Sequence, residues 1–177
     1  YEVRVLGALV RLGRRDDAAE LAAFFLNDRR PRAWNQWPEI AWRDPRSPGH
    51  LGDVPHTWIG AEYVLAVLSM LAFERDADDA LVLAAGVPAS WLDEGCVEVT
   101  GLPTRYGAID FRLERAGART LVATIGGDVT VPPGGMELRP PLAGPLAAVE
   151  LNGHTVRSFD AEHVTVRESP AHVVLRD

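Results

Sequence analysis

Residues 55–75 read PHTWIGAEYVLAVLSMLAFER, a stretch with hydrophobic side chains on nearly every side of a helical wheel. Pro55 suits the first turn of a helix, and Asp53 is placed to cap it. We therefore predict a helix from near Pro55 to about Arg75. Because a helix that is hydrophobic all round must be covered on all sides, this one should be buried among other helices.

The residues before it predict two shorter helices. Between Tyr1 and Gly13, hydrophobic residues recur at helical spacing until the glycine ends the pattern. Asp17, with Glu20 three residues later, resembles a capping box that opens a second helix, and the two should form a helical hairpin. Three helices are too few to surround residues 55–75. Because the sequence also begins with Tyr1 and not Met, we expect it to be a piece of a longer chain.

Beyond about Ala80 the hydrophobic period changes to two, which predicts β-strands. Residues 109–113 and 121–125 alternate in this way on either side of a short turn, and should be neighbouring antiparallel strands. Asn152-Gly153 between two short hydrophobic runs is a strong hairpin signal. Further strands are expected at 149–151, 155–156, 164–166 and 173–175, separated by turns such as Pro132-Pro133-Gly134-Gly135. This part should form a β-sandwich.

Charge and composition exclude several classes of partner. The 177 residues include 25 acidic and 18 basic side chains, a net charge of -7, and no cluster of Arg with interleaved aromatic residues. We therefore expect no nucleic-acid partner. The sequence contains no stretch of about 18 apolar residues, so we expect no membrane-spanning helix. Cys96 is the single cysteine and cannot form an internal disulfide. Because many exported bacterial enzymes also lack disulfides, the location stays open between exported and cytoplasmic.

A loop rich in proline and tryptophan, residues 30–52, separates the second and third predicted helices. Sites for sugars combine aromatic platforms with carboxylates and amides, and this loop has both. Glu39 is the candidate catalytic residue, because a carboxylate among Trp rings is partly desolvated, which raises its pKa and suits it to proton transfer. The candidate substrate-binding residues are Trp34, Gln36, Trp37, Trp42, His56 and Trp58.

Each candidate also has a structural alternative. Glu39 lies near Arg32 and Arg43 in sequence, and such carboxylates often form structural ion pairs. The tryptophans could belong to the core, and His56 could satisfy an amide at a helix start. Glu62, on an otherwise hydrophobic helix, should find an ion-pair partner.

No cofactor and no metal are expected. His50, Asp53 and His56 could be considered as a metal set, but neither their spacing nor a dedicated cluster of ligands supports a zinc site. The sequence also contains no glycine-rich phosphate loop, serine nucleophile elbow or Cys-His pair, which disfavours nucleotide enzymes and the common hydrolases.

Four segments carry a family resemblance: VPHTWIGAEY at 54–63, LAFER at 71–75, LVLAAGVPASWL at 81–92 and LPTRYG at 102–107. Together they resemble the C-terminal end of bacterial six-hairpin glycosidase-like proteins, in which a β-sandwich follows the last helix of an (α/α)6 barrel. Trp37-Pro38-Glu39 is similar to the loop in which several such families place a catalytic carboxylate. The resemblance implies that Glu39 is the general base that activates water, with its acid partner upstream of Tyr1.

The expected fold class is therefore α+β, with residues 1–78 as the last helical hairpins of an (α/α)6 barrel and 79–177 as an antiparallel β-sandwich. The expected function is that of a C-terminal fragment of a glycoside hydrolase, acting on a neutral oligo- or polysaccharide and inactive alone. Its partners would be the carbohydrate and the missing N-terminal part of the barrel. Two alternatives stay open: a non-catalytic carbohydrate-binding or structural module, and a phosphorylase that cleaves with phosphate in place of water.

Overall fold

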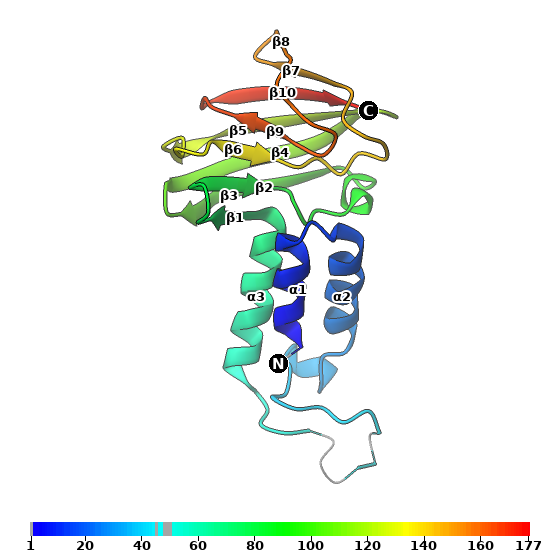
Figure 1. Cartoon of the computed structure of the whole chain (residues 1–177). Coiled ribbons are helices and arrows are strands. Elements are labelled where there is room, and N and C mark those ends of the chain that lie inside the picture. Colours follow the sequence, from blue (N-terminus) through cyan, green and yellow to red (C-terminus); the bar gives the residue numbers. More distant parts are fainter. Residues whose placement is uncertain (1, 45, 48–50) are drawn as a thin grey trace. The chain divides into compact units, whose positions relative to one another are not determined.

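A computed structural model describes residues 2–44, 46–47 and 51–177 of the chain. The chain divides into two compact units, Tyr1–Met70 and Leu71–Asp177. The first unit is helical and the second is built from β-strands (Figure 1). The division falls earlier than residue 78, because the residues after α3 join a sheet and do not extend the helix.

The helical unit contains α1 (Val3–Arg11), α2 (Arg15–Asn27), the short 3-10 helix η1 (Arg32–Trp34) and α3 (Thr57–Leu71). The predicted helical hairpin and the third helix are thus confirmed. Each long helix buries small or aliphatic side chains. These are Val3, Leu6 and Val10 of α1, Ala18 and Ala22 of α2, and Ile59, Ala66 and Met70 of α3. A Cβ added to Gly7 would lie 3.9 Å from Cα of Ala66, so α1 and α3 approach closely there.

Both predicted helix caps are wrong. Helix α2 begins at Arg15 and not after Asp17, whose carboxylate instead pairs with Nε of Arg14 at 2.7 Å. Helix α3 begins at Thr57, and Nδ1 of His56 accepts a hydrogen bond from the Ile59 amide at 3.4 Å. His56 therefore has the capping position that the sequence suggested for Asp53.

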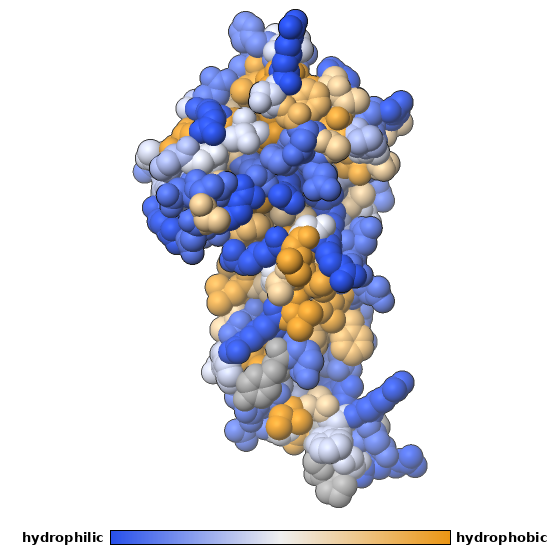
Figure 2. All heavy atoms as spheres, in the orientation of Figure 1, coloured by the Kyte–Doolittle hydropathy of each residue, from blue (hydrophilic) through white to orange (hydrophobic). Residues whose placement is uncertain are grey.

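Helix α3 packs on one side only within the described residues. Its opposite face exposes Val64 and Leu65, with 55% and 59% of their surface accessible to solvent. Figure 2 shows hydrophobic residues at the surface of the helical unit. Helices α1 and α2 therefore cover only part of the hydrophobic surface of α3, which the sequence predicted to be buried on all sides.

The helical prediction for residues 72–75 is also wrong. Ala72–Arg75 is strand β1, which pairs antiparallel with β2 (Ala80–Leu83). The turn between them is held by Arg75, which donates hydrogen bonds to both carboxylate oxygens of Asp78 at 2.8 and 2.7 Å. Backbone pairing with β2, the next strand along the chain, outweighs the local helical pattern here.

The second unit contains eight further strands and a short 3-10 helix, η2 (Ala89–Leu92), among the described residues. The strands are β3 (Cys96–Thr104), β4 (Gly107–Gly117), β5 (Thr120–Val129), β6 (Met136–Leu138), β7 (Ala148–Leu151), β8 (His154–Val156), β9 (Val164–Val166) and β10 (Ala171–Arg176). They form a four-stranded sheet of order β1-β2-β6-β9 and a six-stranded sheet of order β3-β4-β5-β10-β7-β8. One core draws buried side chains from both sheets, so the unit is a β-sandwich.

Most of the predicted pairings are confirmed. Strands β4 and β5 are antiparallel neighbours, with Phe111 opposite Ile125. Strands β7 and β8 form the predicted hairpin, and Asn152 and Gly153 both take positive φ, 49° and 82°, as a tight type I′ turn requires. The expectation of a purely antiparallel sandwich is wrong at one pair, because β2 and β6 run parallel.

Candidate functional site

A pocket of about 690 Å³ lies at the end of the helical unit where the long loop returns to the helices. It is bounded by the first residues of α1 and α3, the last residues of α2 and the loop itself. Its lining residues are Glu2, Val3, Leu21, Phe24, Phe25, Asp28, Arg30, Trp37, Pro38, Glu39, Ala41, Arg43 and Ile59. A hydrophobic wall with a few polar groups is typical of a small-molecule site.

Backbone hydrogen bonds fix the loop segment that carries Glu39. The Glu39 amide donates to the Asp53 carbonyl at 3.0 Å, and the Gly52 amide donates to the Ile40 carbonyl at 2.8 Å. Ala41 and Leu51 form an antiparallel bridge beyond them. The two arms of the loop therefore pair like a short ribbon, which places Glu39 in the pocket wall, where its side chain is partly buried.

Trp37 anchors this ribbon to the helices. Its Nε1 donates a hydrogen bond of 2.7 Å to the carbonyl of Phe25 in α2. Its ring lies against Tyr63 of α3, with the ring centroids 4.4 Å apart. The Tyr63 hydroxyl in turn donates to the Ala22 carbonyl at 3.3 Å, and burial raises the pKa of this tyrosine. Of the six predicted binding residues, Trp37 is the one that lines the described pocket together with Glu39.

Gln36 and two of the predicted tryptophans lie elsewhere on the loop. Oε1 of Gln36 is buried, no described residue donates a hydrogen bond to it, and a Cβ at Gly60 would lie 3.6 Å from it. Trp34 and Trp42 keep 57% and 58% of their surface exposed, and neither lines the pocket. The structure therefore does not bring the predicted aromatic platforms together around Glu39.

His56 and Trp58 form a separate cluster at the start of α3. Their rings are 5.9 Å apart, and Nε1 of Trp58 donates to Oε1 of Glu62 at 3.0 Å. The same oxygen accepts Nε of Arg4 at 3.2 Å, and the guanidinium carbon of Arg4 lies 4.6 Å from the centre of the Trp58 ring. The ion pair predicted for Glu62 is confirmed, and this cluster joins α1 to α3.

Two charged residues of the pocket, Asp28 and Arg30, were missed by the sequence analysis. Asp28 follows the last residue of α2, and Oδ1 of Asp28 accepts hydrogen bonds from Nε and Nη2 of Arg30 at 3.1 and 2.6 Å. Nη1 of Arg30 also donates to the Trp42 carbonyl at 2.9 Å. The sequence shows only that both residues lie at the end of a predicted helix, next to the Trp-rich loop. This position does not predict that both side chains line the pocket.

The part of the chain that the structure describes contains neither a cluster of metal ligands nor a helix that could span a membrane. No group of three or more His, Cys, Asp or Glu among residues 2–44, 46–47 and 51–177 could hold a metal ion. His50, one of the three residues considered for zinc, lies outside the described residues. None of the described helices has the length and hydrophobicity needed to cross a membrane.

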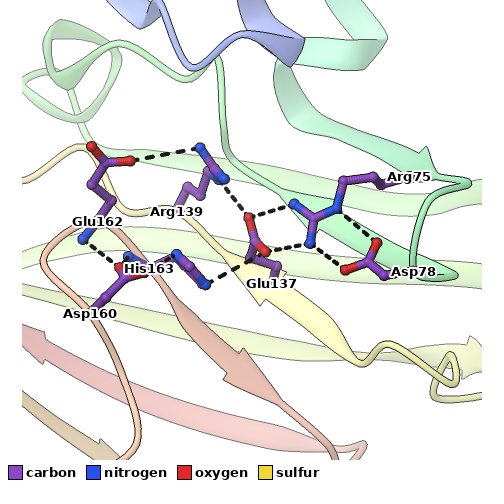
Figure 3. A network of polar contacts seen from close by, with 7 residues as sticks. All are labelled: Arg75, Asp78, Glu137, Arg139, Asp160, Glu162 and His163. Atoms are coloured by element: carbon purple, nitrogen blue, oxygen red, sulfur yellow. Dashed lines mark hydrogen bonds and ion pairs between the residues drawn. The ribbon is translucent and has the colours of Figure 1, made fainter.

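A second charged cluster lies in the sandwich (Figure 3). Glu137 of β6 is only 4% exposed, and it accepts hydrogen bonds from Arg75 at 3.1 and 2.6 Å and from Arg139 at 2.6 Å. Burial alone would raise the pKa of Glu137, but the hydrogen bonds from the two arginines outweigh it and lower the pKa. His163 lies 3.6 Å from Glu137 and 2.9 Å from Asp160. Both carboxylate oxygens of Glu137 are engaged within the protein, as in a structural ion cluster.

Comparisons with known proteins give one distant likeness. No protein-family model matches the chain, and no curated protein sequence matches it. Among solved structures, the chain is similar to Ara127N-Se, a GH127 β-L-arabinofuranosidase from Geobacillus stearothermophilus T6, at 15% identity and a TM-score of 0.37. The similarity covers 67% of this chain and 18% of that enzyme. The chain thus spans less than a fifth of that enzyme, and the likeness is too distant to transfer an activity.

Proposed function

We propose that this chain is the C-terminal part of a glycoside hydrolase-like protein that hydrolyses glycosidic bonds in a neutral oligo- or polysaccharide. Residues 1–70 would supply the last helices of an (α/α)6 barrel, and the β-sandwich would follow them. One observation carries the proposal: Glu39, expected from its Trp-Pro-Glu context to be catalytic, lies in the wall of a 690 Å³ pocket. That volume is within the range of about 300 to 1,000 Å³ that holds small-molecule ligands.

In this proposal Glu39 acts as the general base. Its carboxylate would take a proton from a water molecule as that water attacks the anomeric carbon. Backbone pairing of the loop fixes the position of Glu39 in the pocket wall. Glycoside hydrolysis also needs a carboxylic acid that protonates the leaving oxygen, and we assign that acid to the missing part of the barrel.

Exposed hydrophobic side chains support the proposed missing helices. Val64 and Leu65 of α3 are 55% and 59% exposed. Burying such side chains is favourable by about 1.5 to 3 kcal/mol each when burial is complete. A barrel that continues on this side would cover them, and the partner of this surface would be the N-terminal part of the same protein.

The test is the substitution Glu39→Gln in the parent protein. Removing a general base should lower kcat at least about a hundredfold, because the attacking water then loses its proton acceptor. Asp44→Asn is the matched control, since Asp44 is an exposed carboxylate of the same loop that pairs only with Arg46 among the described residues. Near-normal turnover of the Glu39→Gln protein would exclude the catalytic role.

A second candidate function is a carbohydrate-binding module without catalysis. The observation that favours it is the exposure of Trp34 and Trp42, which present ring surface to solvent outside the pocket. If this alternative holds, replacing both by Ala abolishes glycan binding, and Glu39→Gln leaves binding and any turnover of the parent unchanged.

A further inference from the structure

The carboxylate of Asp28 has one oxygen engaged and one available. Both hydrogen bonds from Arg30 end on Oδ1, at 3.1 and 2.6 Å. No described residue donates a hydrogen bond to Oδ2, although Asp28 lines the pocket and its side chain is 31% exposed. A carboxylate oxygen beside a pocket is a strong acceptor for a ligand hydroxyl, because hydrogen bonds to a charged group are about twice as strong as neutral ones.

Arg30 supplies donors next to this acceptor. Its guanidinium is oriented by Asp28 and by the Trp42 carbonyl, and it retains N–H groups that no described residue accepts. A hydroxyl group both donates and accepts, so an adjacent carboxylate and guanidinium match two neighbouring hydroxyl groups of a ring. A planar guanidinium fixed at two points presents its remaining donors in a defined direction.

The remaining lining decides the charge of the ligand. Three carboxylates line the pocket, those of Glu2, Asp28 and Glu39, against two guanidinium groups, those of Arg30 and Arg43. In the parent protein, where no amino terminus offsets Glu2, this excess of one negative charge disfavours a uronic acid, a sulfated sugar or phosphate. The wall formed by Leu21, Phe24, Phe25 and Trp37 offers hydrophobic surface for the C–H face of a sugar ring.

We propose that Asp28 and Arg30 bind two neighbouring hydroxyl groups of one sugar ring and restrict the pocket to neutral sugars. The inference rests on the proposed function and deepens it, because it names the residues that select the substrate. Asp28 and Arg30 are binding residues here, and the chemical step stays with Glu39.

The test uses the parent protein that contains this chain, in ligand-detected NMR titrations with neutral pentoses and hexoses, with glucuronic acid and with inorganic phosphate. We expect a neutral sugar to bind and Asp28→Asn to weaken that binding about tenfold or more, the usual effect of losing a charge-assisted hydrogen bond. Asp44→Asn, in the same loop but outside the pocket, should leave the affinity within about twofold.

Deoxy sugars make the result independent of any folding defect in the variant. Removing the hydroxyl group that donates to Asp28 should weaken binding to the natural protein about tenfold. The same removal should change little for the Asp28→Asn protein, because the charged partner of that hydroxyl group is already lost. Equal losses in both proteins, tighter binding of glucuronic acid or phosphate, or no binding of any neutral sugar would overturn the inference. A failure of the proposed function gives a different result. In that case Glu39→Gln would leave turnover of the parent protein intact, while sugar binding would still depend on Asp28.

Discussion

Replacing Glu137 by Gln should destabilise the β-sandwich, because this carboxylate neutralises two guanidinium groups at the surface of the four-stranded sheet. Glu137 is 4% exposed and accepts three hydrogen bonds, from Arg75 and Arg139. Gln has nearly the same size, so the substitution leaves no cavity. It removes the buried negative charge and turns an NH₂ group toward the donors of the two arginines. Arg75 keeps Asp78 and Arg139 keeps the more distant Glu162, but both lose their hydrogen bonds to a buried carboxylate.

The expected loss is about 2 kcal/mol in the free energy of unfolding. Removing one partner of a fully buried ion pair costs about 3 to 5 kcal/mol. The side chains of Arg75 and Arg139 keep 32% and 23% of their surface exposed, so water screens part of the remaining repulsion. For a unit of this size, about 2 kcal/mol corresponds to a decrease in Tm of about 10 °C.

The effect should depend on pH in a definite direction. The pKa of Glu137 is lower in the folded protein than its ordinary value, so the carboxylate stabilises the fold fully above the unfolded pKa of about 4.3. This contribution is lost as the pH falls through the lower folded pKa. The difference between wild type and Glu137→Gln should therefore be largest at neutral pH and shrink below about pH 4.

The assay is urea unfolding read by amide hydrogen exchange in β6 and β9, which reports the sandwich separately from the helices. The matched control is Glu98→Gln, because Glu98 pairs with Arg112 at 2.8 Å but both side chains are about half exposed, 56% and 44%. The control should change stability by less than about 0.5 kcal/mol. A Glu137→Gln protein as stable as this control at pH 7 would refute the argument that burial makes the cluster important.

Two further substitutions test the loop and a turn. Trp37→Phe should destabilise the helical unit by about 1 kcal/mol, because the Phe25 carbonyl loses its 2.7 Å hydrogen bond. Amide hydrogen exchange in the loop segment around Glu39 should become faster. Unchanged exchange would count against an anchoring role for Trp37. Gly134→Ala should destabilise the sandwich by about 1 to 3 kcal/mol in thermal unfolding, because its Cβ would lie 2.3 Å from the Asp78 carbonyl oxygen. The control Gly126→Ala should have little effect, because no atom lies within 4 Å of the added Cβ. Similar melting temperatures for the two variants would contradict this reasoning.

Several elements of the fold could be predicted because their signals are local. The alternating residues of β4 and β5 and the Asn152-Gly153 turn specify strands and a hairpin from neighbouring side chains alone. The hydrophobic residues of α1 recur at helical spacing, and this local pattern likewise specifies a helix. The candidate site was predicted less completely, because Glu39 could be identified from its context but its neighbours in the pocket could not. Asp28 and Arg30 reach that pocket only when α2 and the loop have packed together.

The sequence by itself determined the three long helices, the strand-rich second half and the turn at Asn152-Gly153, since each depends on contacts a few residues apart. Only the tertiary structure decided where α3 ends. Residues 72–75 continue a helical pattern, yet they pair with β2 across the turn at residues 76–79. This pairing prevails because β2 is itself held in the four-stranded sheet by β6, which comes from a distant part of the sequence. The same holds for the parallel pair β2 and β6, for the buried Glu137 cluster and for the pocket around Glu39, all of which depend on residues far apart in sequence.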